Sequence, residues 1–142
     1  MENQNFVIDD GLKTYTFSNT NKEVFASFQF NPTDTSILER YEKTVDAFNA
    51  INLKGDSDKD IEEYIKTLSQ TFKEQFNYLL NRDVTEDLFR VYSPVTVFAN
   101  GDFFAEVILK KIGQVIESEM NIRLTKKAKK IEKYTSKYRK HK

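Results

Sequence analysis

The chain has 142 residues, and its 22 Lys and Arg balance 22 Asp and Glu, so the formal net charge is zero. It contains no cysteine, which excludes disulfides, thiolate metal sites and a cysteine nucleophile. The 12 Phe and 7 Tyr are too many aromatics for a disordered chain, and the length suits one domain. No window is apolar enough to span a membrane, and the first residues lack the pattern of a secretory signal. We therefore expect a cytoplasmic protein.

The zero net charge conceals two oppositely charged parts. Residues 121–142 contain ten Lys and Arg and one acid, Glu132, whereas residues 1–120 contain 12 basic and 21 acidic side chains. The sequence therefore predicts an acidic globular domain over 1–120, carrying about −9, and a basic extension over 121–142, carrying about +9. A cationic extension of this kind favours an acidic partner.

The first elements are predicted to form a β-hairpin over about 13–30. Aromatic and β-branched residues dominate two runs that are separated by a plausible turn at Asn19–Lys22. Period-two alternation puts Tyr15 and Phe17 on one face of the first strand, and Val24, Ala26, Phe28 and Phe30 on one face of the second. An isolated hairpin is marginally stable in water, so it must pack on the rest of the chain or on another one.

Helices are predicted over about 36–53, 58–81, 86–92 and 103–120, from apolar residues at helical spacing. Ser36 and Glu39 fit a capping box, although Thr33 or Asp34 could equally cap the first helix. Asp102 is the expected N-cap of the last helix. Residues 95–99 are β-branched but short, so strand and helix both stay open for them. The predicted fold is α+β and predominantly α, with three to four helices and an N-terminal hairpin.

The last helix has no internal proline and is expected to continue into the basic extension, to about Lys137. Its length would then be about 50 Å, longer than a domain of this size is wide. The second half would therefore project or pack on another subunit. Together with the uncovered hairpin, this predicts a homo-oligomer.

The expected core consists of the aromatic and aliphatic residues at helix and strand positions that share one face. These are Phe28, Phe30, Leu38, Tyr41, Val45, Phe48, Ile61, Ile65, Leu68, Phe72, Phe76, Leu79, Phe89, Phe104, Ile108, Ile112 and Val115.

Catalytic patterns are nearly absent. The single histidine, His141, is the penultimate residue, so no histidine-based triad or metal site can be built around it. The alternation of Asp56, Asp58 and Asp60 is similar to the start of a calcium loop, but Ile61 stands where that loop needs glycine, so helix capping explains the acids better. We expect no enzymatic activity, no cofactor and no bound metal.

Several short motifs occur in an order that resembles a family of small proteins from tailed phages of Gram-positive bacteria. They are Phe28-Gln-Phe-Asn-Pro-Thr-Asp34 with Ser36-Ile-Leu-Glu-Arg-Tyr41, then Asp87-Leu-Phe89, Tyr92-Ser-Pro94, Gly101-Asp-Phe-Phe-Ala-Glu106 and a Lys/Tyr-rich end from Ile131 to Arg139. The resemblance covers about Phe28 to Tyr138. Such proteins are encoded among tail genes of siphophages and prophages and are usually interpreted as tail assembly chaperones.

The resemblance implies a non-enzymatic protein that acts in the bacterial host cytoplasm, is absent from the mature virion, and binds tape-measure or tail-tube subunits during tail assembly. The apolar spacing in the basic extension suits a helix in a protein groove, and so predicts a partner-binding face there. Its residues are Leu124, Lys126, Lys127, Lys130, Ile131, Lys133, Tyr134, Lys137, Tyr138 and Arg139.

Two alternative functions stay open. The basic extension could bind nucleic acid, with its tyrosines stacking on bases, although the acidic body opposes this. The protein could also bind a host factor, either to block a defence system or to be sensed by one. A solvated terminus without any function is a third interpretation of the extension.

Overall fold

The computed structural model describes residues 3–51 and 61–131. Within them, two strands are followed by four helices: β1 (Lys13–Ser18), β2 (Val24–Phe30), α1 (Ser36–Asn49), α2 (Ile61–Leu80), α3 (Thr85–Phe89) and α4 (Phe104–Met120). The α+β class and the N-terminal hairpin predicted from the sequence are confirmed. The predicted helices agree with α1 to α4, apart from ends that differ by a few residues or lie outside the described ranges.

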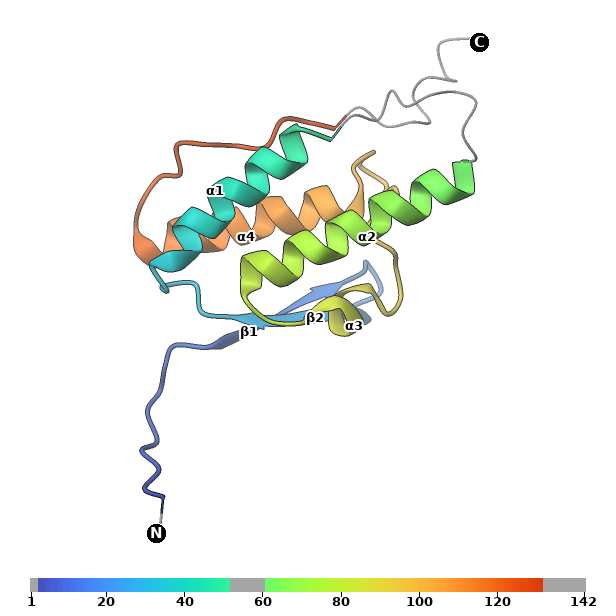
Figure 1. Cartoon of the computed structure of the whole chain (residues 1–142). Coiled ribbons are helices and arrows are strands. Elements are labelled where there is room, and N and C mark those ends of the chain that lie inside the picture. Colours follow the sequence, from blue (N-terminus) through green and yellow to red (C-terminus); the bar gives the residue numbers. More distant parts are fainter. Residues whose placement is uncertain (1–2, 52–60, 132–142) are drawn as a thin grey trace.

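The three long helices lie on one side of the hairpin, and short α3 lies beside β2 (Figure 1). Helices α1 and α2 pack against each other, with the ring of Phe48 from α1 lying 4.9 Å from the ring of Phe72 and 5.8 Å from that of Phe76. The hairpin is thus stabilised by packing on the helical layer. An isolated hairpin lacks this contact and would be marginally stable in water.

The hairpin contains a β-bulge that changes which side chains face the core. Strands β1 and β2 pair antiparallel from Lys13 opposite Phe30 to Phe17 opposite Ala26, and the register then shifts. The extra residue is Phe25, whose ring packs in the core, whereas Val24 is 58% exposed. The expectation that Val24 shares one face with Ala26, Phe28 and Phe30 is therefore wrong, because a bulge resets the alternation of a strand.

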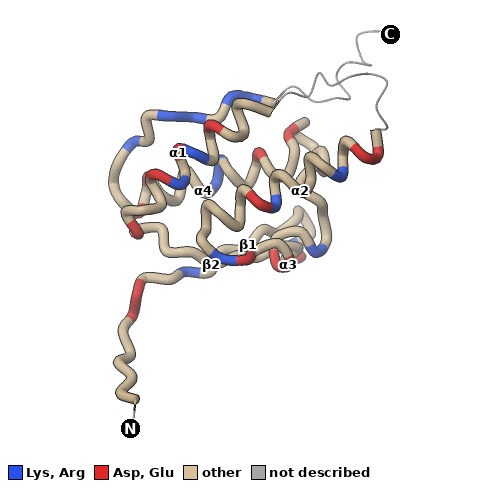
Figure 2. Tube along the Cα trace, in the orientation of Figure 1, with Lys and Arg blue, Asp and Glu red and all other residues tan. Residues whose placement is uncertain are grey.

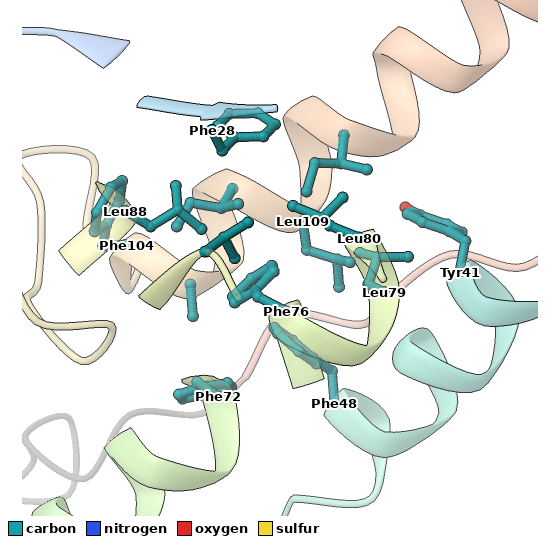
Figure 3. Close-up of a cluster of buried hydrophobic side chains, with 14 of the residues drawn as sticks. Phe28, Tyr41, Phe48, Phe72, Phe76, Leu79, Leu80, Leu88, Phe104 and Leu109 are labelled. Atoms are coloured by element: carbon teal, nitrogen blue, oxygen red, sulfur yellow. The ribbon is translucent and has the colours of Figure 1, made fainter. Parts of the chain in front are cut away.

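One aromatic ring joins the hairpin, α3 and α4. Phe104 is fully buried at the start of α4, and its ring centroid lies 5.6 Å from those of both Phe17 and Phe25, 5.8 Å from Phe89 and 4.9 Å from Phe98. Figure 3 shows this ring among the buried side chains contributed by different helices and β2. Clusters of this kind add specific ring–ring interactions to the burial of apolar surface.

Most of the predicted core is buried, but two residues are not. Ile61 and Ile65 are each 44% exposed, because the first two turns of α2 extend beyond the other elements (Figure 1). Leu38, Phe89 and Val115 are half-buried against the core. The buried apolar side chains that were not part of the expected core are Ala26, Ile37, Leu80, Val84, Leu88, Phe103, Ala105, Leu109, Ile116 and Ile131.

Residues 95–99, for which the sequence left strand and helix open, form neither of them. A single antiparallel bridge joins Val97 to Phe103, and the amide of Phe98 donates to the carbonyl of Asp102 at 2.8 Å. Asp102, the expected N-cap, precedes the actual cap Phe103, whose amide donates to the Glu106 carboxylate at 2.8 Å. The glutamate at the third helical position therefore satisfies the first free amide of α4.

The predicted continuation of the last helix is wrong for residues 121–131. Helix α4 ends at Met120, since Asn121 has the left-handed conformation (φ 53°) and the amide of Ile122 donates to the carbonyl of Glu117 at 3.1 Å. This bond closes the helix end in the manner common for left-handed caps. The basic segment that follows is not helical as far as Ile131, the last described residue.

We predict that Phe72→Ala lowers the free energy of unfolding by about 3–5 kcal/mol, because this fully buried ring would leave a cavity between α1 and α2. The matched control is Ile65→Ala on the exposed part of the same helix, which should cost well under half as much. Equilibrium denaturation measures both values. Equal losses for the two variants would contradict the assignment of the buried face.

Candidate functional site

The most distinctive feature is the basic segment 121–131, here called the strap. It leaves the end of α4, reverses, and runs back along α1 (Figure 1, red-orange). Figure 2 shows its Lys and Arg residues following one another along this path. Part of the positively charged extension therefore lies against the body of its own chain.

The reversal begins with a polar contact to α4 and an ionic contact to α1. The amide of Leu124 donates to the carboxylate of Glu117 at 2.8 Å. The ammonium of Lys126 lies 2.7 Å from the carboxylate of Asp46 and 3.5 Å from that of Glu42. The hydrogen bond to Asp46 is the main cause of a raised pKa for Lys126, so this contact favours the charged form of the ammonium. The acidic face of α1 is thus one electrostatic partner of the basic strap.

Two side chains hold the strap backbone further along. The amide oxygen of Asn49 accepts the Lys129 amide at 2.7 Å, and its nitrogen donates weakly to the Lys127 carbonyl at 3.5 Å. Glu106 caps its own helix with one oxygen and accepts the Ile131 amide with the other, at 3.0 Å. Since Ile131 is 94% buried, an apolar anchor completes these contacts.

A groove of about 500 Å³ lies between the strap, α1 and α4. Its apolar lining includes Tyr41, Phe48 and Leu109, which are almost fully buried, and half-buried Leu124. Its charged lining residues are Asp102, Glu106, Lys110, Glu117, Lys126, Lys127, Lys129 and Lys130. The remaining lining residues are Asn100, Gly113, Gln114 and Ala128. A volume of this size, lined by both apolar and charged side chains, is in the range of sites that take a ligand or a few side chains.

Close packing of Tyr41 on Gly113 shapes this groove. A Cβ atom at Gly113 would lie 3.0 Å from Cζ of Tyr41 and closer still to its hydroxyl oxygen. Burial raises the pKa of Tyr41 to about 12, so the hydroxyl stays protonated at neutral pH. Glycine in the middle of α4 is therefore explained by space, despite its low helix propensity.

The predicted partner-binding residues do not share one helical face where the structure describes them. Leu124 is half-buried, Ile131 is buried, and Lys126 is held by α1. Lys127 and Lys130 are exposed at the groove. Five predicted residues lie outside the described ranges: Lys133, Tyr134, Lys137, Tyr138 and Arg139.

A second surface was not predicted from the sequence. Residues 3–10, here called the arm, are exposed throughout and extend away from the hairpin (Figure 1). Three consecutive apolar residues lie in it: Phe6 is 78% exposed, Val7 91% and Ile8 78%. The sequence signal that could have indicated this surface is the apolar triplet itself, which stands between Asn5 and Asp9 and belongs to no predicted element.

The described residues contain no group of three or more His, Cys, Asp or Glu side chains that could hold a metal ion. None of the described helices is both long enough and apolar enough to cross a membrane. His141 and the Asp56–Asp60 alternation lie outside the described ranges. Tyr15 has a buried hydroxyl without a hydrogen-bond partner among the described residues, but its ring packs on the core, stacked on Phe28 and tilted against Phe30.

Comparisons with protein-family models, curated proteins and solved structures find no match for this chain.

We predict that Asn49→Ala loosens the strap without unfolding the body. The amide of Lys129 loses its acceptor in this variant, so its hydrogen exchange should accelerate by about tenfold, as expected for about 1.4 kcal/mol of lost protection. The Ile131 amide, held by Glu106, should change less. Glu39→Ala on the exposed face of α1 is the control. Unchanged exchange at Lys129 would contradict the anchoring role of Asn49.

We predict that Gly113→Ala destabilises the protein by at least about 1 kcal/mol, because overpacking against Tyr41 outweighs the gain in helix propensity. In the Tyr41→Phe background the hydroxyl is gone, and the same substitution should cost measurably less. A double-mutant cycle in equilibrium denaturation gives this coupling. A coupling indistinguishable from zero would show that the tyrosine hydroxyl does not impose the glycine.

Proposed function

We propose that the protein is a non-enzymatic, chaperone-like phage tail assembly protein that binds tape-measure or tail-tube subunits in the host cytoplasm and is absent from the mature virion. Its resemblance to tail-gene proteins over about Phe28 to Tyr138 suggests the process. The structural observation that carries a binding function is apolar surface left uncovered on a small folded body. Apolar surface of this kind commonly marks protein-interaction sites.

The exposed start of α2 suits a helical partner. Ile61 and Ile65 are one helical turn apart, and half-buried Tyr64 is next to Ile65 in the same two turns. A stripe with this spacing can lie along the apolar stripe of another helix. A tape-measure protein is long and helical and would expose such stripes before the tail tube encloses it, so covering them would prevent aggregation.

The strap contributes charge to this function. Lys127, Lys129 and Lys130 are exposed, and they form no ion pair within the described part of the chain. Charges at the rim of an interface mainly raise the association rate and select acidic partners, and they add less to the lifetime of the complex. We therefore assign partner capture to the apolar turns of α2 and steering to the strap lysines.

Co-expression with the cognate tape-measure protein tests the proposal. The wild-type protein should increase the soluble fraction of the tape measure and co-purify with it, whereas Ile61→Ser with Ile65→Ser should lose most of both effects. Val91→Ser is the control, because Val91 is 54% exposed but lies outside α2. Mass spectrometry of purified virions should not find the protein.

Unchanged tape-measure and tail-tube solubility, or a stoichiometric presence in finished virions, would overturn the proposal. A pull-down from infected cells that recovers host proteins in place of tail proteins would favour the host-factor alternative. Binding to nucleic acid with a steep salt dependence would favour the nucleic-acid alternative.

A further inference from the structure

The arm is held in a defined direction where it joins the body. The carboxylates of Asp9 and Asp10 accept the amides of Gly11 and Leu12, each at 3.0 Å. Gly11 has a φ of 87°, and the side chain of Asn31 donates to the carbonyl of Asp10. Glycine is needed at this bend, since a left-handed conformation is strained for other residues. The arm thus leaves the body at a constrained turn.

The arm carries an alternating apolar pattern. In an extended chain Phe6 and Ile8 point to one face and Val7 to the other. All three are more than three-quarters exposed, so the chain's own body does not cover them. Two acids, Asp9 and Asp10, follow directly. The arm therefore has the form of a docking segment with two apolar anchors and an acidic flank.

The groove under the strap is complementary to this segment. Of its apolar lining, Tyr41, Phe48 and Leu109 are almost fully buried, so half-buried Leu124 and exposed Ala128 are the accessible apolar side chains. Its volume of about 500 Å³ accommodates one aromatic and one aliphatic side chain. The exposed lysines of the strap lie at the same groove and are available to acidic groups: Lys127, Lys129 and Lys130. Both the apolar anchors and the acidic flank of the arm thus find a counterpart there.

The arm and the strap lie on opposite sides of the molecule, with the hairpin and the helical layer between them (Figure 1). In this arrangement the arm cannot occupy the groove of its own chain. We propose that Phe6 and Ile8 of one copy insert into the groove of a second copy, while Asp9 and Asp10 face the strap lysines of that copy. This inference is independent of the tail-assembly proposal, because it concerns the purified chain alone.

Such a contact joins two different surfaces, so each copy keeps one arm and one groove. Contacts of this head-to-tail kind continue from copy to copy and form rings or open chains. Assembly should therefore pass beyond the dimer as concentration rises. It should also weaken with salt, because exposed charge pairs are screened.

Complementation between two variants tests the proposal. The arm variant is Phe6→Ser with Ile8→Ser, and the groove variant is Gln114→Trp, which fills the groove from an exposed position of α4. Each variant alone should need at least about tenfold more protein to associate, equivalent to about 1.4 kcal/mol. A mixture of the two should form a 1:1 dimer and nothing larger, because only one intact arm and one intact groove remain.

Sedimentation velocity and light scattering measure these species, and thermal melting confirms that each variant is folded. Val24→Ser, at an exposed valine of the hairpin, is the control and should assemble like the wild type. A wild-type chain that stays monomeric at all concentrations would overturn the proposal. The proposal would also be overturned if the arm variant abolished assembly while Gln114→Trp left assembly intact. That result would assign the arm to a sheet edge instead.

Discussion

The aromatic contact made by Phe104 is the interaction on which the rest of the fold depends. Its ring touches β1 through Phe17, β2 through Phe25, and α3 through Phe89. The backbone next to it reinforces the same position, since the amide of Phe104 donates to the carbonyl of Thr96 at 2.8 Å. Because the β-bulge is what turns Phe25 inward, the hairpin and the first turn of α4 are coupled. The start of α4 is thereby placed so that Glu106, in the same first turn, lies within reach of the strap.

The second constraint is electrostatic and links the C-terminal strap to α1. A basic segment covalently attached to an acidic body has a high local concentration near that body. The strap uses this through Lys126 and the two acids of α1, but its position is set by uncharged contacts as well, namely the Asn49 amide and the buried side chain of Ile131. Exposed ion pairs alone are worth little. The combination leaves the next three lysines, 127, 129 and 130, at the surface, beside the groove.

These features describe a molecule with separate surfaces for binding. The arm, the first turns of α2 and the lysine-rimmed groove are distinct places, built on one small core. The proposals for tape-measure binding and for self-association use different apolar surfaces, α2 for the first and the arm with the groove for the second, and they share the exposed strap lysines. A repetitive helical partner would then be bound by several weak contacts at once, which raises the overall affinity without any single tight site.

The sequence alone determined the element types, most of the core and the division of charge. These depend on local spacing and counts, such as the period that places Phe48, Phe72 and Phe76 inside. It could not determine the path of residues 121–131, because the lysines and apolar residues there are compatible with a helix, and the groups that hold the strap come from distant positions: Asp46, Asn49 and Glu106. The same applies to Ile61, Ile65 and Phe6, whose exposure depends on which surfaces remain to cover them. Only the tertiary structure decided that the helix ends at Asn121 and that the strap folds back, since burial of Ile131 and pairing of Lys126 require α1 and α4 to be already in place.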